Sequence, residues 1–119
     1  MNDEKDDLRQ RTKRFALRVI KLYESLPRSG SANVLGHQLL RSGTSIGANF
    51  REAHRARSDA EFVSKVGDSL KELEETAYWL ELLAESGTVS AKKLTLLMDE
   101  TSQLTAILTS IVKKIRARL

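Results

Sequence analysis

Four segments of the chain carry apolar residues at intervals of three and four, the spacing that places side chains on one face of an α-helix. No run of β-branched residues alternates with polar residues, and no Asn-Gly or Asp-Gly turn occurs. The pattern therefore predicts an all-α protein without strands. We expect its helices over about residues 6–26, 32–56, 59–85 and 91–117.

Each predicted helix carries one continuous stripe of core positions. In the first two helices the stripes consist of Leu8, Phe15, Val19, Leu22 and Leu26, and of Leu35, Leu39, Ser42, Ile46, Asn49 and Ala53. In the last two they consist of Phe62, Val66, Leu70, Leu73, Ala77, Leu80 and Ala84, and of Leu94, Leu97, Thr101, Leu104, Leu108, Ile111 and Ile115. Short connections make consecutive helices antiparallel neighbours. We therefore expect an antiparallel up-and-down four-helix bundle, formed as a single domain by residues 1–119.

Capping and helix-breaking residues mark the helix boundaries. Pro27, the only proline, separates the first two helices, and Ser31 is placed to cap the second. The sequence Ser-Asp-Ala-Glu at 58–61 is a capping box at the start of the third helix. Gly87 is expected to end that helix, and Ser90 is placed to cap the fourth.

Composition narrows the class of protein. The chain has 119 residues, 40% of them apolar, which suffices for one folded domain. It has no cysteine, which excludes disulfides and thiolate chemistry, and no apolar run approaches the ~18 residues of a membrane span. The first seven residues are polar and mainly acidic, unlike a signal peptide. We expect a cytoplasmic protein with no membrane partner.

Charge is distributed unevenly along the chain. Residues 1–57 carry 12 basic and 6 acidic side chains, residues 58–87 carry 2 and 8, and residues 88–119 carry 6 and 2. The third predicted helix is therefore anionic and the other segments are cationic. This asymmetry favours either a polyanionic partner or contacts between basic and acidic faces of neighbouring subunits.

Basic side chains at helical spacing form a candidate nucleic-acid-binding surface. It comprises Arg11, Arg14, Arg18, Lys21, Arg41, Arg51, Arg55 and Arg57. Arginine donates paired hydrogen bonds to phosphate oxygens, which RNA and DNA backbones both present. Only 5% of residues are aromatic, so we expect no base-stacking platform and little sequence specificity. The alternative is that these side chains form ordinary solvated helix faces.

Two features outside the core stripes favour contact between subunits. Glycines recur along one edge of the second helix, which permits either a close helix crossing or a subunit contact. An apolar group lies off the predicted stripe near the end of the third helix and is typical of a partner surface. The candidate interface residues of the expected homo-oligomer are Gly36, Gly43, Gly47, Trp79, Leu82 and Leu83.

Two polar residues interrupt the apolar stripe of the second helix. Asn49 lies near its centre, where a buried amide needs hydrogen-bond partners on another helix or on the backbone. Ser42 lies on the same stripe, and we expect its hydroxyl to bond the carbonyl one turn back. We predict structural roles for both, because polar core residues can fix the register of helices.

The sequence contains no recognisable catalytic or metal-binding constellation. His37 and His54 are 17 residues apart, which fits no metal-ligand spacing. Lysine-containing phosphate loops, Gly-x-Ser-x-Gly elbows and paired Glu-x-x-His motifs are absent. We therefore expect a non-enzymatic protein that needs neither a cofactor nor a metal.

The second predicted helix contains a stretch that resembles a family signature: residues 38–53 read QLLRSGTSIGANFREA. The stretch is similar to the pattern Q-L-x-R-S-x-x-S-I-x-x-N-I-x-E-G of the four-helix bundle proteins encoded in intervening sequences of bacterial 23S ribosomal RNA genes. The matching residues are Arg41, Ser42, Ser45, Ile46, Asn49 and Glu52. The resemblance extends over about residues 12–115 and departs at Phe50, where isoleucine is usual, and at Ala53, where glycine is usual.

The resemblance implies a bundle that assembles into a ring-like homopentamer with basic surfaces. The accessory variability determinant of diversity-generating retroelements is similar to this family. Its place beside a reverse transcriptase implies nucleic-acid binding for that branch. No catalytic site is implied, so the matching residues look like parts of the architecture.

The residues and the resemblance together support two functional hypotheses. The first is a non-enzymatic oligomeric bundle that binds RNA or DNA backbones through basic helix faces. The second is a protein-interaction scaffold, for example an accessory subunit of a reverse transcriptase, that binds no free nucleic acid under physiological conditions. Affinity for nucleic acid at physiological salt separates the two.

Overall fold

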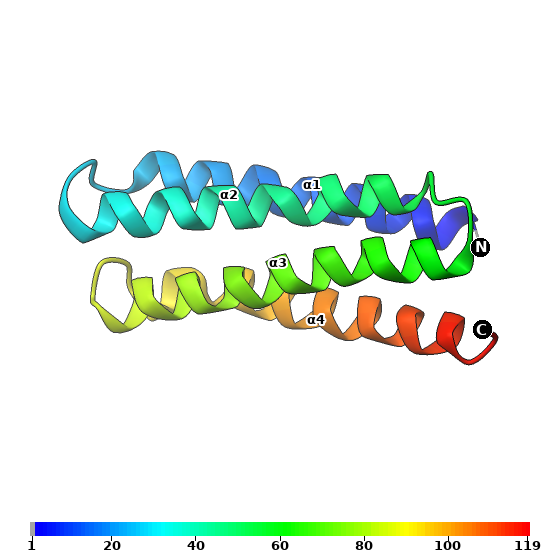
Figure 1. The fold of residues 1–119 in the computed structure, drawn as a ribbon. Coiled ribbons are helices and arrows are strands. Elements are labelled where there is room, and N and C mark those ends of the chain that lie inside the picture. Colours follow the sequence, from blue (N-terminus) through cyan, green and yellow to red (C-terminus); the bar gives the residue numbers. More distant parts are fainter. Residues whose placement is uncertain (1) are drawn as a thin grey trace.

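The chain folds into four α-helices joined by short connections (Figure 1). The computed structural model describes residues 2–119, with side chains from Asp7 onward. Met1 and the side chains of residues 2–6, most of the acidic N-terminal segment, lie outside the described residues. The helices are α1 (Asn2–Ser25), α2 (Gly30–Ala53), α3 (Asp59–Glu85) and α4 (Ala91–Arg116). The all-α prediction is confirmed, since the described chain contains no strand.

Serine side chains cap the last two helices as the sequence predicts. Ser58 Oγ accepts a hydrogen bond from the backbone N–H of Glu61 at 3.1 Å, which forms one half of the capping box. Ser90 Oγ accepts from the N–H of Lys93 at 3.4 Å. These bonds satisfy N–H groups that have no partner inside the helix, so both helices begin where expected.

The second helix is shifted relative to its prediction. It begins at Gly30, with Ser29 in the extended N-cap position, and Ser31 is not its cap. It ends at Ala53, about three residues earlier than expected. The residues that follow leave the helix through a tighter turn, in which backbone N–H groups bond the carbonyl three residues back.

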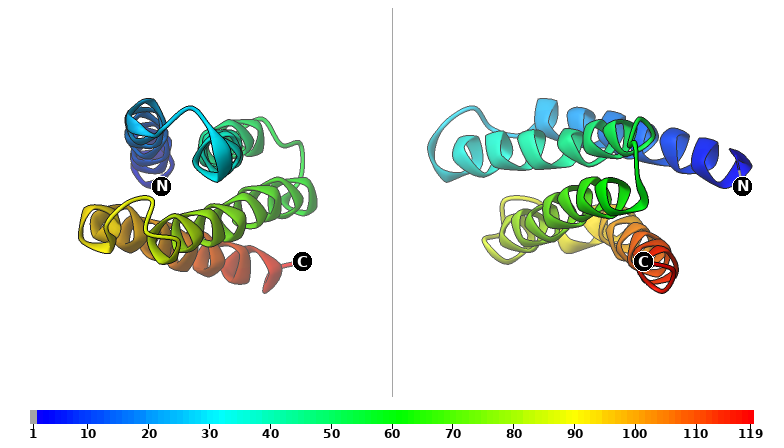
Figure 2. Two further views of the ribbon diagram at one scale, coloured as in Figure 1. Left: turned by 90° about the vertical axis from the view of Figure 1, so that its left-hand side faces the viewer. Right: turned by 45° about the vertical axis from the view of Figure 1, so that its right-hand side comes forward.

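Two antiparallel helix hairpins pack against each other to form the bundle. The hairpins are α1 with α2 and α3 with α4. The most extensive contact between them joins α2 to α3, and a much smaller one joins α1 to α4. Figure 2 shows that the hairpins cross at an angle, because α3 and α4 are inclined where α1 and α2 are seen end-on. The molecule measures 47 × 21 × 21 Å. The predicted four-helix bundle is confirmed, with α2 and α3 at its centre.

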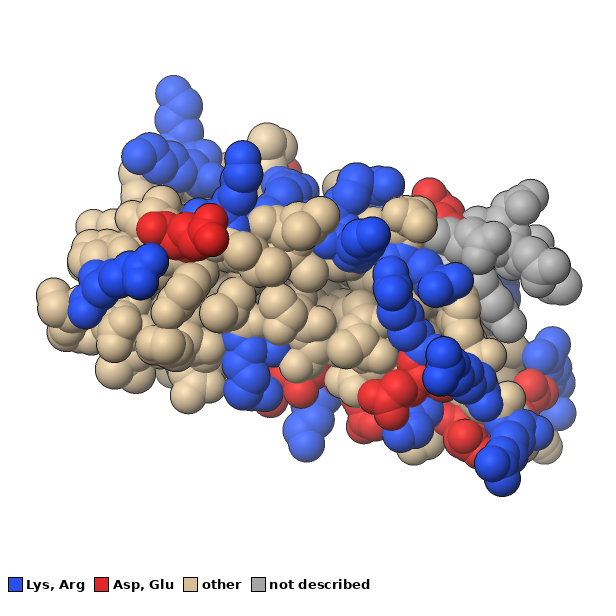
Figure 3. All heavy atoms as spheres, turned by 90° about the horizontal axis from the view of Figure 1, so that it is seen from above, with Lys and Arg blue, Asp and Glu red and all other residues tan. Residues whose placement is uncertain are grey.

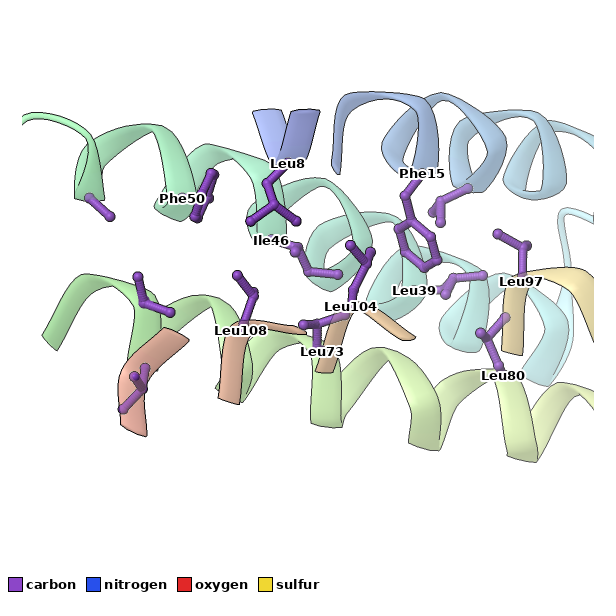
Figure 4. Packing of buried hydrophobic residues seen from close by; sticks show 14 of the residues in the cluster. Leu8, Phe15, Leu39, Ile46, Phe50, Leu73, Leu80, Leu97, Leu104 and Leu108 are labelled. Carbon is purple, nitrogen blue, oxygen red and sulfur yellow. The ribbon is translucent and has the colours of Figure 1, made fainter. Parts of the chain in front are cut away.

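One apolar core runs along the bundle between the two hairpins (Figure 4). Its fully buried members include Leu8, Phe15, Val19, Leu39, Ile46, Phe50, Leu73, Leu80, Leu94, Leu104 and Leu108. Complete burial of one such side chain contributes about 1.5–3 kcal/mol. All four helices supply members, which is why no single helix is stable without the others.

Two residues that the apolar stripes place in the core, Asn49 and Ala77, are not buried in the structure. Phe50 of α2 is fully buried, whereas Asn49 is only half-buried and is not the central buried amide that the stripe predicts. On α3, Leu83 is fully buried although it was predicted off the core, and Ala77 is exposed. In both helices the larger apolar side chain lies in the core, because its burial removes more apolar surface from water.

Hydroxyl groups supply buried polar contacts between α2 and α3. The Thr76 hydroxyl lies 2.9 Å from Ser42 Oγ and 2.8 Å from the carbonyl oxygen of Glu72. Ser69 Oγ donates to the carbonyl oxygen of Ile46 at 2.8 Å. Ser42, Ser69 and Thr76 are all fully buried. These short side chains satisfy their own polar atoms and still allow the two central helices to approach closely.

The three glycines of α2 lie directly beneath α1. A Cβ atom added at Gly36, Gly43 or Gly47 would come within 2.9–3.0 Å of a side-chain atom of the α1 segment. All three are buried. They therefore serve the close crossing of α1 and α2, which is one of the two roles expected for them. Covered by α1, they do not reach the outer surface where a second subunit would bind.

Gly43→Ala is expected to lower the free energy of unfolding by about 1–2 kcal/mol, because the added methyl group meets both Cγ atoms of buried Val19 at 2.9 Å. The matched change Gly67→Ala, at an exposed position with no atom within 4 Å, should raise it by about 0.5–1 kcal/mol through helix propensity. Urea unfolding followed by circular dichroism measures both changes. Equal stabilisation by the two alanines would contradict the close crossing.

Candidate nucleic-acid interface

Arg11 is bound inside the protomer and does not extend an open basic face. Its Nη2 atom lies 2.7 Å from Glu100 Oε1, and its Nε atom lies 3.0 Å from Oε2 of the same carboxylate. This hydrogen-bonded carboxylate raises the pKa of the Arg11 guanidinium. The pair joins α1 to α4, which otherwise make only a small contact. Arg11 thus has a carboxylate partner within the protomer, and its predicted contact with phosphate stays a prediction.

Arg41 is also held by carboxylates of the same chain. Its Nη2 atom lies 2.6 Å from Glu75 Oε1, and its Nη1 atom lies 3.5 Å from Glu72 Oε1. Both glutamates belong to the anionic helix α3. Part of the negative charge of α3 therefore forms ion pairs with Arg41 of α2 within one protomer. Arg41 is accordingly less available to an external phosphate.

The other six predicted phosphate contacts are exposed, and none of them forms an ion pair with another described residue. They are Arg14, Arg18, Lys21, Arg51, Arg55 and Arg57. Figure 3 looks onto the face formed by α1 and α2 and shows that Lys and Arg side chains predominate there. The candidate nucleic-acid interface comprises this face and the six residues, of which Arg55 and Arg57 lie in the connection that follows α2.

Large apolar side chains are exposed near one end of the bundle. The exposed fractions are 53% for Leu17, 60% for Val34, 53% for Tyr78 and 71% for Leu96. Each residue lies on a different helix. The connection 26–29 joins α1 to α2, the connection 86–90 joins α3 to α4, and each residue is at most eight residues from the helix end next to one of them. Both connections lie at the same end of the bundle (Figure 1). We call this group of four residues the apolar end.

The predicted interface patch of α3 is only partly at the surface. Trp79 and Leu82 are half-buried, and Leu83 belongs to the core. The indole ring of Trp79 packs against Tyr78 at a centroid distance of 5.2 Å, and its Nε1 atom is buried without a hydrogen-bond partner among the described residues. The sequence prediction missed all four residues of the apolar end because they lie singly on separate helices.

Titratable side chains do not gather into a metal centre in the part of the chain that the structure describes. His37 contacts Tyr23 edge-on at a centroid distance of 5.4 Å, and His54 contacts Phe50 in the same way at 4.7 Å. His37 thus packs against a ring of α1, and His54, which directly follows α2, packs against a ring of α2. None of the described helices combines the length and hydropathy needed to cross a bilayer.

Comparison with known proteins agrees with this architecture. A family model described as 23S rRNA-intervening sequence protein matches residues 4–110. Among solved structures, the chain is similar to a protein with unknown function from the S23 ribosomal protein family of Bacteroides thetaiotaomicron, with a TM-score of 0.86 and 38% sequence identity. That similarity covers 92% of this chain and 97% of the other chain.

Neither of these two descriptions names a reaction. No curated protein matches the chain. The family model spans nearly all of the four helices, from near the start of α1 to the second half of α4. The chain therefore belongs to the 23S rRNA-intervening sequence protein family.

Proposed function

We propose that the protein is a non-enzymatic, oligomeric four-helix bundle of the cytoplasm that binds RNA or DNA backbones through the outer face of α1 and α2. The observation that carries the proposal is the set of six exposed basic side chains on and beside this face that have no carboxylate partner within the described chain. An unpaired guanidinium can bind phosphate without first giving up an internal ion pair. Binding then gains the free energy of counterion release.

Low sequence specificity follows from the chemistry of the same face. Its exposed groups are mainly arginine and lysine, which bind phosphates irrespective of the base. The one aromatic ring that is more than half exposed, Tyr78, lies on α3, away from the outer face of α1 and α2. Bases therefore have no stacking platform on the proposed surface.

Affinity for nucleic acid should fall steeply as salt is raised. With six phosphate contacts, the affinity for a short RNA or DNA is expected to drop about 10³-fold between about 50 and 200 mM monovalent salt. Fluorescence anisotropy of a labelled oligonucleotide, titrated at several salt concentrations, measures the slope. Two oligonucleotides of unrelated sequence should give the same slope and similar affinities. A slope near zero would contradict binding through phosphates.

Assembly of several protomers is supported by the apolar end. Each of the four helices exposes one large apolar side chain near this end of the bundle, and exposed apolar surface of this kind can be covered by a partner. Because members lie on different sides of the bundle, one protomer can contact two neighbours through different patches, as a closed ring requires. A homopentamer is the assembly that the family resemblance implies.

Leu96→Arg is expected to weaken assembly, because it places a charge in the most exposed position of the apolar end. Leu119→Arg is the matched control, since Leu119 is 66% exposed at the opposite end of the bundle. Light scattering on both variants gives the mass relative to the 13.4 kDa protomer. A wild-type protein that is monomeric at micromolar concentration would contradict the proposed oligomer.

The apolar end also favours a second function, a scaffold that binds another protein such as a reverse transcriptase. In that case the basic face serves the protein partner, and free nucleic acid does not bind at physiological salt. The salt titration separates the two functions, because a scaffold gives no anisotropy change near 150 mM salt, where the Debye length is about 8 Å. Persistence of the oligomer under the same conditions would then favour the scaffold.

A further inference from the structure

A hollow lies on the outer surface where α1 passes the C-terminal end of α2. Its volume is about 460 Å³. It is lined by Arg9 from α1 and by Arg51, Glu52, His54 and Arg55 from the end of α2 and the turn that follows. Arg9 is not among the residues that the sequence singles out as phosphate contacts. Only the packing of α1 against α2 places it beside the other arginines.

The close helix crossing explains why these arginines meet. A Cβ atom at Gly47 would lie 3.0 Å from Thr12 Oγ1, so the two backbones approach closely at this level. Arg51 lies one turn after Gly47 on α2, and Arg9 lies one turn before Thr12 on α1. Side chains three or four positions apart share a helix face. The two guanidinium groups therefore flank the same stretch of the crossing, and Arg55 follows in the turn after α2.

The positive charge in the hollow is not neutralised by any described residue. None of the three arginines forms an ion pair with a described residue, and the Nε atom of Arg9 is buried without a hydrogen-bond partner among those residues. The carboxylate of Glu52, the one acidic residue in the described lining, is bound to Lys65 Nζ of α3 at 3.2 Å. A buried charged donor without an acceptor is unfavourable, so the hollow favours an anionic ligand.

Compensation of the helix dipole accounts for only part of this cluster. Basic residues near a helix C-terminus are favourable, and Arg51 and Arg55 lie there. The backbone carbonyls at the end of α2 already accept hydrogen bonds from the N–H groups of residues 54–56, so neither arginine is needed to cap them. Arg9 belongs to a different helix, and the dipole of α2 gives no reason for its enclosed Nε atom.

We propose that the hollow is a phosphate-binding site, in which Arg9, Arg51 and Arg55 together bind one phosphate group of a nucleic acid. Forked guanidinium groups from two helices can donate to several oxygens of the same group. His54 adds its imidazole to the wall and is held against the buried ring of Phe50. The assignment of a nucleic acid as the source of the phosphate rests on the proposed function.

Inorganic phosphate tests the site without any nucleic acid. Phosphate added to wild type at constant ionic strength, against chloride, should shift the NMR signals of the Arg9, Arg51 and Arg55 Nε–H groups. Arg51→Gln should weaken this binding about tenfold, because it removes a charge-assisted donor. Arg51→Lys keeps the charge without the fork and should weaken binding less. Arg116→Gln, exposed on α4 outside the hollow, is the matched control and should leave phosphate binding unchanged.

Oligonucleotides of one sequence, with and without a 5′-phosphate, identify which phosphate occupies the site. If the double variant Arg51→Gln/Arg55→Gln loses affinity for both oligonucleotides equally, the site binds an internal phosphodiester. If wild type prefers the 5′-phosphorylated oligonucleotide and the double variant loses that preference, the site binds a terminal phosphate. Either result supports the site. Loss of the same size in a matched Lys92→Gln/Lys93→Gln variant, changed at two exposed positions on α4, would overturn it.

Failure of this site and failure of the proposed function give different results. If phosphate causes no larger shift than chloride while RNA still binds with a steep salt dependence, the hollow is not a site and the basic face remains. If phosphate binds in the hollow but neither RNA nor DNA binds, the site stands and nucleic acid is not its source of phosphate.

Discussion

Simultaneous replacement of Arg14, Arg18 and Lys21 by glutamate is expected to weaken nucleic-acid binding about a hundredfold near 0.1 M salt. The three side chains are exposed at intervals of four and three on the solvent side of α1. Each substitution removes one phosphate contact and adds a repelling carboxylate. The slope of log affinity against log salt should become shallower by about 0.9 for each contact on duplex DNA. Fluorescence anisotropy measures both quantities.

The control for this experiment separates the assigned face from net charge. Lys71, Lys92 and Lys93 are also exposed and form no ion pair with described residues, but they lie on α3 and α4. Their triple replacement by glutamate changes the net charge by the same amount and should weaken binding far less. If both triple variants lose affinity equally, binding follows overall charge and the assignment to α1 and α2 is wrong.

Arg11 is not among the reversed charges because its replacement would remove a contact between α1 and α4 as well as a surface charge. Its guanidinium binds Glu100 of α4 through two hydrogen bonds, so a glutamate there would face a second carboxylate. None of the three substituted residues forms an ion pair. The thermal unfolding of the triple variant should therefore match that of wild type, which shows that lost binding reflects the surface.

The number of helices and the boundaries of α3 and α4 could be predicted because local signals determine them. Spacing by three and four, the serine caps and Gly87 all act within a few residues of the boundary that they mark. The rotation of each helix about its axis depends instead on its neighbours. Asn49 and Phe50 point about 100° apart on α2, and only the packing of α1 and α3 decides which of them enters the core.

The candidate site could be predicted only in part for a similar reason. Exposed arginines on one helix are visible as a periodic pattern, and Arg14 and Arg18 follow it. The partner of an arginine is not visible, since Arg11 and Glu100 are 89 residues apart in the sequence. Arg9 joins the phosphate-binding hollow for the same reason, because its neighbours there come from the end of α2.

Phe50→Ala is expected to lower the free energy of unfolding by about 3–5 kcal/mol, the usual cost of removing a fully buried aromatic ring. Asn49→Ala should change it by less than about 0.5 kcal/mol or raise it slightly, because the half-buried amide makes way for a better helix former. Urea unfolding at one fixed protein concentration measures both, since assembly makes stability depend on concentration. Phe50→Ile keeps most of the apolar volume and should cost less than alanine.

The opposite result would affect the proposed site as well as the core. If Asn49→Ala were the costly change, α2 would be turned about its axis so that Asn49 faces the core in place of Phe50. Arg51 belongs to α2 and Arg55 follows in the next turn, so this rotation would carry both of them away from Arg9. The hollow at the α1–α2 crossing would then lose its arginine pairings. Stability of two core variants and binding of phosphate by Arg51 therefore test one geometry, the rotation of α2 beneath α1.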